Sequence, residues 1–253
     1  MGKYSGILIC SDFDGTLFDG EKIPENNITA IKEFRREGGL FTVISGRPVN
    51  FLPPFFEGYK FGVPAVNLNG AVIYDVDGDK PVSESFMQGL TRELALSYAS
   101  LVDDYNDLIF FPIGEILRIP RDSVNTVTEE LCKSTHKFII ELHSDCSLME
   151  SDRAYERIKE AVGDKFDVVR SSYRLIEILD KRLTKGKAAR FLKEYTGSHT
   201  LICVGDYEND IEMLEEADVG YAVANASERV KASADRITVS AKEGAIAKII
   251  SEL

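Results

Sequence analysis

Short apolar runs alternate with amphipathic segments near both ends of the chain. An apolar run at residues 7–11 precedes a segment at 24–36 with apolar residues at helical spacing, and a second apolar run follows at 40–44. These patterns predict a buried strand, an amphipathic helix and another strand. A strand, helix and strand in this order form a right-handed unit with two parallel strands. The pattern returns with a helix predicted at 186–195 and a strand at 200–204.

The middle of the chain has a different pattern, in which short apolar runs come in pairs with helical segments between them. One of these helices is predicted over residues 122–133. We expect roughly residues 83–178 to form an inserted α+β domain of their own. The remaining residues, 1–82 and 179–253, are expected to form a discontinuous α/β core with a Rossmann-like parallel sheet.

Composition and charge narrow the function classes. The 253 residues are 44% hydrophobic and 28% charged, and the net charge is −12. This charge argues against nucleic-acid binding by bulk attraction and against a polybasic membrane surface, so any phosphate that the protein binds must be held by a local site. The N-terminus leads into an apolar run too short for a signal peptide, and no apolar stretch approaches a membrane span. We therefore expect a cytoplasmic protein. These observations do not determine the oligomeric state, for which we expect a monomer or a small homo-oligomer.

Two carboxylates follow the first predicted strand directly. Asp12 and Asp14 are spaced by one residue, so both side chains can face one pocket before Gly15 lets the chain turn away. Carboxylates held this close repel each other unless a cation or a proton intervenes, and Mg²⁺ prefers such oxygen ligands. The alternative is a solvated turn in which the Asp side chains cap backbone amides.

Polar residues also follow the next strands. Ser45, in the sequence Ser-Gly-Arg-Pro, follows the second strand, where its hydroxyl and nearby backbone amides can hold a phosphoryl oxygen. A turn that caps the following helix is an equally good interpretation of Ser45 taken alone. Asn69-Gly70 lies between two apolar runs, and this spacing favours a hairpin turn over a contact with substrate.

Further candidates lie in the C-terminal part of the chain. Lys185 precedes Gly186 at the start of a predicted helix, and Asp206, Asn209 and Asp210 follow the strand at 200–204. Lys187 is an alternative to Lys185, but it is placed about 200° around the helix and is expected to point into solvent.

The order of these elements resembles the haloacid dehalogenase superfamily of phosphatases. The motifs are Asp-x-Asp-Gly-Thr at residues 12–16, Ser-Gly-Arg-Pro at 45–48, the Asn-Gly and Lys-Gly pairs, and Gly-Asp-x-x-Asn-Asp at 205–210. Together they are similar to the Cof-type branch, subclass IIB. The resemblance covers the whole chain and implies a large α/β cap, which determines substrate specificity, inserted at residues 83–178.

The resemblance also implies a role for each motif. Asp12 would attack phosphorus to form an aspartyl-phosphate, and Asp14 would act as the general acid and base. Mg²⁺ would be held by the Asp12 carboxylate, the Asp14 backbone carbonyl and Asp206. Asn209 and Asp210 would orient these groups. The residues expected to bind the substrate are Ser45, Gly46, Arg47, Asn69 and Lys185, although Arg47 can equally serve as a structural cap.

We therefore predict a Mg²⁺-dependent phosphatase that acts on a small phosphorylated metabolite such as a sugar phosphate. Two alternatives remain open at this point. A phosphomutase or other phosphotransferase would share the aspartyl-phosphate but pass the group to a hydroxyl other than water. A non-catalytic metabolite-binding protein on the same fold is the less favoured alternative, since all the catalytic side chains are present.

Overall fold

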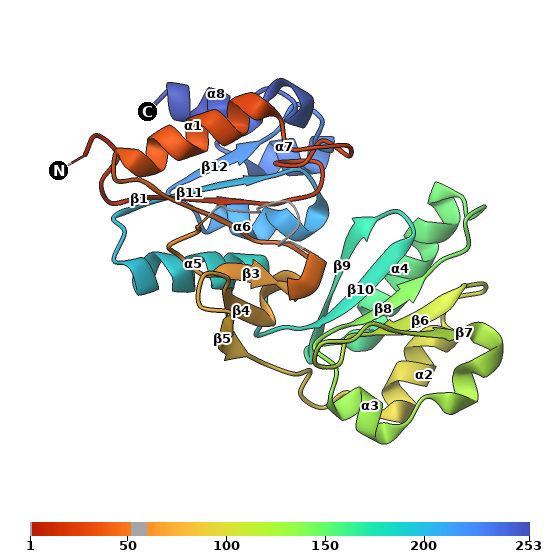
Figure 1. Cartoon of the computed structure of the whole chain (residues 1–253). Coiled ribbons are helices and arrows are strands. Elements are labelled where there is room, and N and C mark those ends of the chain that lie inside the picture. Colours follow the sequence, from red (N-terminus) through yellow and green to blue (C-terminus); the bar gives the residue numbers. More distant parts are fainter. Residues whose placement is uncertain (1, 52–59) are drawn as a thin grey trace. The chain divides into compact units, whose positions relative to one another are not determined.

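The computed structural model describes residues 2–51 and 60–253. The chain folds into two compact units, one from Met1–Ser83 with Thr184–Leu253 and the other from Glu84–Leu183 (Figure 1). The second unit ends at Leu183 and not at residue 178 as predicted, because the strand Leu175–Asp180 pairs with two strands of that unit. The predicted fold class, an α/β core with a parallel sheet and an inserted α+β unit, is confirmed.

A parallel sheet lies at the centre of the first unit, with strand order β13-β12-β11-β1-β2. Strand β1 pairs in parallel with β2 on one side and β11 on the other, so the predicted neighbour relation of the first two apolar runs is confirmed. A parallel sheet of this kind is covered on both faces, which explains why the strands β1, β2 and β11 are largely apolar and buried. The strands are β1 (Ile7–Ser11), β2 (Leu40–Val43), β11 (Thr200–Gly205), β12 (Val219–Ala222) and β13 (Arg236–Ile237).

Helices cover both faces of this sheet, with α1 and α8 on one face and α5 and α6 on the other (Figure 1). The apolar residues Ile31 and Phe34 of α1 are buried, as its helical spacing predicts. The helices are α1 (Glu25–Arg36), α5 (Lys185–Thr196), α6 (Ile211–Glu215), α7 (Glu228–Ser233) and α8 (Ala245–Ser251). Short 3₁₀ turns lie at η1 (Val49–Phe51), η5 (Glu208–Asp210) and η6 (Ala241–Glu243).

A small sheet, β3-β4-β5, follows β2 in the first unit, and its strands β3 and β4 are antiparallel. Its strands are β3 (Ala65–Asn67), β4 (Val72–Asp75) and β5 (Lys80–Glu84). The 3₁₀ turn η3 (Leu68–Gly70) joins β3 to β4, which confirms a turn at the Asn-Gly pair. Leu68 and Asn69 both have positive φ, at 51° and 57°, which is uncommon for residues other than glycine.

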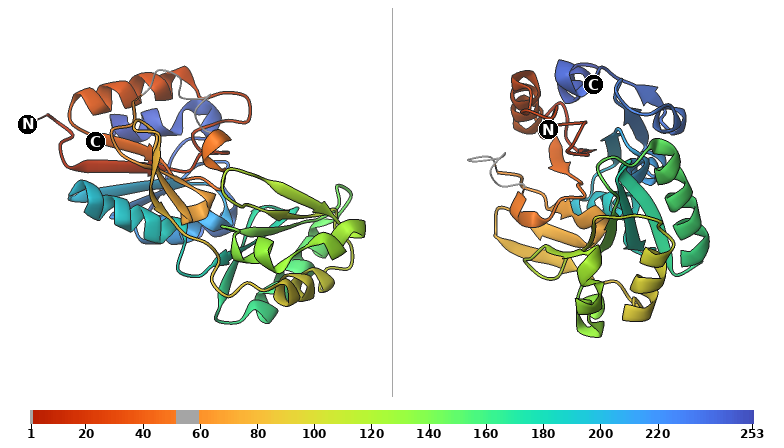
Figure 2. Two further views of the ribbon diagram at one scale, coloured as in Figure 1. Left: turned by 60° about the horizontal axis from the view of Figure 1, so that its bottom comes forward. Right: turned by 90° about the vertical axis from the view of Figure 1, so that its right-hand side faces the viewer.

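The second unit is an antiparallel sheet, β7-β6-β8-β10-β9, with helices packed on one face. Figure 2 gives two further views of these helices. The elements are α2 (Arg92–Ser100), β6 (Asp107–Phe110), β7 (Leu117–Pro120), η4 (Arg121–Thr126), α3 (Glu129–Lys133), β8 (Phe138–Glu141), α4 (Leu148–Val162), β9 (Phe166–Ser172) and β10 (Leu175–Asp180).

The helix predicted over residues 122–133 is not continuous. It is split into η4 and α3, because Val127 is extended and Thr128 caps α3 by accepting a hydrogen bond from the Leu131 amide. Apolar spacing alone does not reveal such a break. Across the described parts of the chain, no helix has the length and apolar character needed to cross a membrane.

Candidate active site

Three of the predicted site residues lie where neighbouring parallel strands end. Asp12 follows β1, Ser45 follows β2 after Ile44, and Asp206 follows β11. The carboxyl ends of parallel strands meet at one edge of the sheet, so residues from three distant parts of the sequence converge there. The topology therefore brings together the candidates that the sequence analysis placed at strand ends.

The carboxylates of Asp12, Asp206 and Asp210 form a compact cluster. One oxygen from each lies within 4.8 Å of the other two. Asp12 and Asp210 are buried, at 5% and 0% exposure. Buried carboxylates at this spacing repel one another unless positive charge lies among them, and an all-oxygen donor set suits a hard divalent cation. The residues present therefore fit a metal ion of the magnesium class.

Lys185 supplies a positive charge to this cluster. Its Nζ donates hydrogen bonds to Asp12 Oδ1 and to Asp210 Oδ1, each at 2.6 Å. Lys185 is the first residue of α5, where Thr184 caps the helix by accepting from the Lys187 amide, and it is 2% exposed. Lys187 is exposed, as predicted for the residue that points into solvent.

Burial shifts the protonation of these groups strongly. Burial, followed by the charge of Asp210, raises the pKa of Asp12 well above its ordinary value, and Lys185 opposes this shift. The same two causes raise the pKa of Asp206 to about 7. Burial lowers the pKa of Lys185, but the charges of Asp12 and Asp210 outweigh burial and raise this pKa above its ordinary value. Lys185 is thus a cation at neutral pH, next to carboxylates that gain from a further positive charge.

The side chain of Asp14 points to different partners. Its two carboxylate oxygens accept hydrogen bonds from Arg47, from Nε at 2.7 Å and from Nη2 at 2.6 Å. The Asp14 side chain is 49% exposed and is not a member of the acidic cluster. The predicted metal contact of Asp14 is through its backbone carbonyl and stays a prediction.

Ser45 and its neighbours form the next part of the site. Ser45 is buried, and its Oγ accepts a hydrogen bond from the Arg47 amide at 3.1 Å. The Asn69 amide donates to the Ser45 carbonyl at 3.0 Å, and the Asn69 side chain lies close to Gly46, where an added Cβ would be 3.1 Å from Asn69 Oδ1. Asn209 Nδ2 donates to the same Oδ1 at 3.4 Å. Asn69 and Asn209 therefore meet beside the Ser-Gly turn.

Comparisons with known proteins identify the family. The model of the haloacid dehalogenase-like hydrolase family matches residues 9–250. The chain belongs to this family. The predicted Cof-type resemblance is confirmed, and so is the prediction of a phosphatase.

Named relatives of this haloacid dehalogenase-like hydrolase match along nearly its whole length. It is 25% identical to 5-amino-6-(5-phospho-D-ribitylamino)uracil phosphatase YitU of Bacillus subtilis, over 97% of this chain and 96% of the relative. It is also 25% identical to pyridoxal phosphate phosphatase YbhA of Escherichia coli, over 96% and 97%. The subclass IIB sugar phosphatase BT4131 has the same fold, with a TM-score of 0.76, 22% identity, and coverage of 97% and 98%.

Two residues of the hydrolase escaped the sequence analysis. Thr16 Oγ1 donates to Asp206 Oδ1 at 2.9 Å, and Asn225 Nδ2 donates to the Gly15 carbonyl at 2.8 Å. Asn225 also accepts from the Ala241 amide, so it connects the loop after β1 to the C-terminal part of the chain. Thr16 belongs to the Asp-x-Asp-Gly-Thr motif and was within reach of sequence reasoning, whereas the partners of Asn225 depend on the fold.

Asp210 was predicted only to orient neighbouring groups, but it makes further contacts. Its Oδ2 accepts from the amides of Asp206 and Tyr207 at 3.0 and 3.1 Å, as expected for a residue that orients Asp206. Its Oδ1 binds Lys185, and its carboxylate belongs to the acidic cluster. Asp210 is therefore a candidate metal ligand as well. Its position four residues after Asp206 is the feature of the sequence that could have indicated this.

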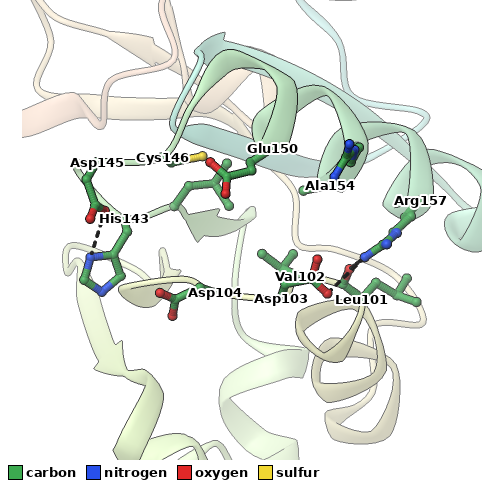
Figure 3. A pocket seen from close by; sticks show the side chains of 12 residues that line it. Leu101, Val102, Asp103, Asp104, His143, Asp145, Cys146, Glu150, Ala154 and Arg157 are labelled. Atoms are coloured by element: carbon green, nitrogen blue, oxygen red, sulfur yellow. Dashed lines mark hydrogen bonds and ion pairs between the residues drawn. The ribbon is translucent and has the colours of Figure 1, made fainter.

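A cavity of about 250 Å³ lies in the second unit of the hydrolase, between the end of α2 and the first half of α4 (Figure 3). Ion pairs lie among its lining residues: Arg157 Nη1 is 3.1 Å from Asp103 Oδ1, and His143 Nδ1 is 3.6 Å from Asp145 Oδ1. Among the described residues that line it, none was predicted to be catalytic, to bind substrate or to hold a metal. We therefore place the candidate active site at the sheet edge of the first unit.

Proposed function

We propose that this phosphatase hydrolyses a small phosphorylated metabolite in a Mg²⁺-dependent reaction through an aspartyl-phosphate on Asp12. One observation carries the proposal: the buried Asp12 carboxylate, directly after β1, accepts a hydrogen bond from the Lys185 ammonium and clusters with the carboxylates of Asp206 and Asp210. A nucleophilic carboxylate needs positive charge beside it to approach a phosphate dianion. The Lys185 contact and the donor set for a cation supply it.

In the first step, an Asp12 oxygen bonds to phosphorus as the bond from phosphorus to the leaving oxygen breaks. Asp14 gives its proton to that leaving oxygen, which becomes the hydroxyl of the first product. The Ser45 hydroxyl and the Lys185 ammonium donate hydrogen bonds to the phosphoryl oxygens. Each such donor contributes roughly a hundredfold or more to the rate when it matches the charge of the transition state.

In the second step, water attacks the phosphorus of the aspartyl-phosphate as the bond to Asp12 breaks. Asp14, now a carboxylate, takes the proton of the attacking water, and inorganic phosphate leaves. Asp14 thus returns to its acid form and Asp12 to its carboxylate. Splitting one difficult displacement into two easier ones is the advantage of a covalent intermediate.

The proposed magnesium ion would be held by the carboxylates of Asp12 and Asp206 and by the backbone carbonyl of Asp14, with Asp210 beside them. When bound, the ion supplies positive charge that offsets the repulsion between the nucleophile and the phosphate. Thr16 and the Asp210 carboxylate orient Asp206 through their hydrogen bonds. A divalent metal is a general requirement of phosphatases of this family, and magnesium is our proposal for this chain.

We further propose that the unit Glu84–Leu183 serves as the cap that selects the leaving group. In the sequence it is inserted between Ser45 and Lys185, which both belong to the first unit. The names of three proteins similar to the whole chain give their substrates as a phosphorylated ribitylaminouracil, pyridoxal phosphate and sugar phosphates, which supports a small phosphorylated metabolite as substrate. A cytoplasmic protein that is a monomer or small homo-oligomer, with neither a nucleic-acid nor a membrane partner, is the setting we propose.

Phosphate release tests the proposal directly. The assay uses a panel of sugar phosphates, nucleotides, phosphoglycolate, pyridoxal phosphate and phosphorylated ribitylaminouracil, each with Mg²⁺ and with EDTA. We expect release that requires Mg²⁺, no turnover by Asp12→Asn, and homoserine at position 12 after the intermediate is trapped with borohydride. Hydrolysis by Asp12→Asn at a rate near that of the unaltered protein would refute the assignment of Asp12 as the nucleophile.

A further inference from the structure

The contact between Arg47 and Asp14 has the geometry of a two-bond fork. The Arg47 Nε and Nη2 atoms each donate to a different oxygen of the Asp14 carboxylate, at 2.7 and 2.6 Å. A planar guanidinium holds a carboxylate in one orientation through two parallel hydrogen bonds, which a point charge such as a lysine ammonium does not do. The contact therefore restricts the direction as well as the position of Asp14.

Arg47 is itself held at several points. Its amide donates to Ser45 Oγ at 3.1 Å, and its carbonyl accepts from Asn67 Nδ2 at 3.1 Å and from the Leu68 amide at 3.2 Å. The Leu68 backbone keeps a positive φ at this turn, an uncommon conformation that the surrounding structure must support. The backbone of Arg47 is thus held from two sides, by Ser45 in its own loop and by the turn between β3 and β4.

Two stacked aromatic rings support the side chain of Arg47. Its guanidinium carbon lies 5.2 Å from the ring centre of Phe13 and 5.8 Å from that of Phe18. The two rings are stacked with centres 5.3 Å apart and planes 5° from parallel. Contacts between an arginine and aromatic faces are favourable and leave the edge of the guanidinium available for hydrogen bonds. The rings therefore hold the guanidinium in place, and the guanidinium in turn determines the position of the Asp14 carboxylate.

Stability alone does not explain this arrangement. The side chains of Arg47 and Asp14 are 29% and 49% exposed, and ion pairs in contact with solvent contribute at most about 1 kcal/mol to folding in most cases. An acid and base at the surface, by contrast, loses much of its effect when its side chain samples several rotamers, since proton transfer needs a fixed geometry.

We propose that Arg47 is a positioning residue that holds Asp14 in the direction required for proton transfer, and this rests on the proposed function. During turnover one of the two contacts is released, so that one Asp14 oxygen carries the transferred proton while the other stays bound to Arg47. This role differs from direct binding of the substrate phosphate, because it acts through Asp14 alone.

Leaving groups of different acidity provide the test. An alkyl phosphate, the best found in the substrate panel, needs a proton on its leaving oxygen, whereas p-nitrophenyl phosphate leaves as a stable anion and needs little help. We expect Arg47→Gln to lower kcat for the alkyl ester by about tenfold or more and kcat for the aryl ester by less than about threefold. Arg47→Lys keeps the charge without the fork and should not restore kcat.

The Asp14→Asn background separates the two roles of Arg47. If Arg47 acts through Asp14, adding Arg47→Gln to Asp14→Asn should change the remaining alkyl-ester activity by less than about threefold, as expected for residues that act as a unit. Arg36→Gln, which removes an exposed arginine paired with Glu33 on α1, is the matched control and should leave both activities unchanged. Circular dichroism and thermal unfolding verify that each variant folds.

The outcomes separate this inference from the proposed function. Equal losses on both esters, rescue by Arg47→Lys, or a KM increase that persists in the Asp14→Asn background would each overturn the positioning role and leave the proposed function standing. Full alkyl-ester activity of Asp14→Asn would overturn both the acid and base assignment and the inference. Absence of phosphate release by the unaltered protein would refute the proposed function, and the inference with it.

Discussion

Replacing Lys185 by methionine is the sharpest test of the electrostatics of the site. Lys185 is 2% exposed, and its ammonium is 2.6 Å from an oxygen of Asp12 and 2.6 Å from an oxygen of Asp210. Methionine has a similar length and no charge, so Lys185→Met leaves a cluster of buried carboxylates without its cation. Lys187→Met, an exposed position two residues along the same helix, is the matched control.

The expected loss of stability follows from the burial of these groups. Removing one partner of a buried ion pair costs about 3–5 kcal/mol, because the remaining charge is left in a poorly solvated place. For a chain of this size, 1 kcal/mol corresponds to roughly 2–4 °C in the thermal midpoint, so a fall of about 6–20 °C is expected. Lys187→Met should change stability by no more than about 0.5 kcal/mol.

The loss should depend on pH with a definite sign. Lys185 opposes the rise in the pKa of Asp12, so its removal leaves that pKa further above the unfolded value. A carboxyl with a raised pKa stabilises the folded state at low pH, and this contribution is lost as pH rises through the folded pKa. The destabilisation of Lys185→Met should therefore be larger at pH 8 than at pH 5.5.

Thermal and urea unfolding in EDTA, at both pH values, measure these differences. Phosphate release with Mg²⁺ is recorded in parallel and should be lost in Lys185→Met and retained in Lys187→Met. An unfolding midpoint of Lys185→Met equal to that of Lys187→Met at pH 8 would refute the view that Lys185 compensates buried charge. Because the chain has two compact units, each transition is assigned to its unit before free energies are compared.

Three further predictions follow from the structure. Gly15→Ala should lower kcat/KM for phosphate release, because Gly15 has a φ of +79° and an added Cβ would lie 2.4 Å from Asp206 Oδ2; wild-type kinetics would argue against this close approach. Lys137→Met should destabilise the second unit by about 3–5 kcal/mol in urea unfolding, because the carboxylate of Glu177, 2.9 Å from Lys137 Nζ, stays buried without its partner. Adding Glu177→Leu should recover most of this loss. Additive losses from the two substitutions would contradict the pairing. In EDTA the thermal midpoint should fall as pH rises from 5 to 8. The pKa of Asp206 is raised to about 7, so over this range the folded state holds a proton that the unfolded chain releases. An Asp206→Asn variant whose midpoint falls with the same slope would be evidence against this explanation.

The elements that carry the site were predictable because their signals are local. Apolar runs at β1, β2 and β11 predict buried strands, and polar residues that directly follow such strands must lie at one edge of a parallel sheet. Asp12, Ser45 and Asp206 lie there for this reason. The directions of Lys185 and Lys187 were equally predictable, because they follow from the local geometry of α5. The two residues lie on different sides of the helix, so Lys185 is buried and Lys187 is exposed.

Local patterns are less informative where two interpretations have the same spacing. The segment 122–133 has apolar residues at helical intervals, yet its backbone is extended at Val127, where Thr128 begins a new helix. The boundary of the second unit near Leu183 likewise depends on which strands β10 pairs with, and pairing partners are distant in the sequence.

By itself, the sequence determined the parallel core, the edge of the sheet at which the candidate site lies, and the acidic, hydroxyl and lysine groups that reach it. Only the tertiary structure decided which of these groups meet: Asp210 joins Asp12 around Lys185, whereas Asp14 turns to Arg47. The physical reason is that chain geometry determines the face on which a residue lies. The direction of a long or charged side chain depends on the charges and rings around it, and these come from segments that only the fold brings together.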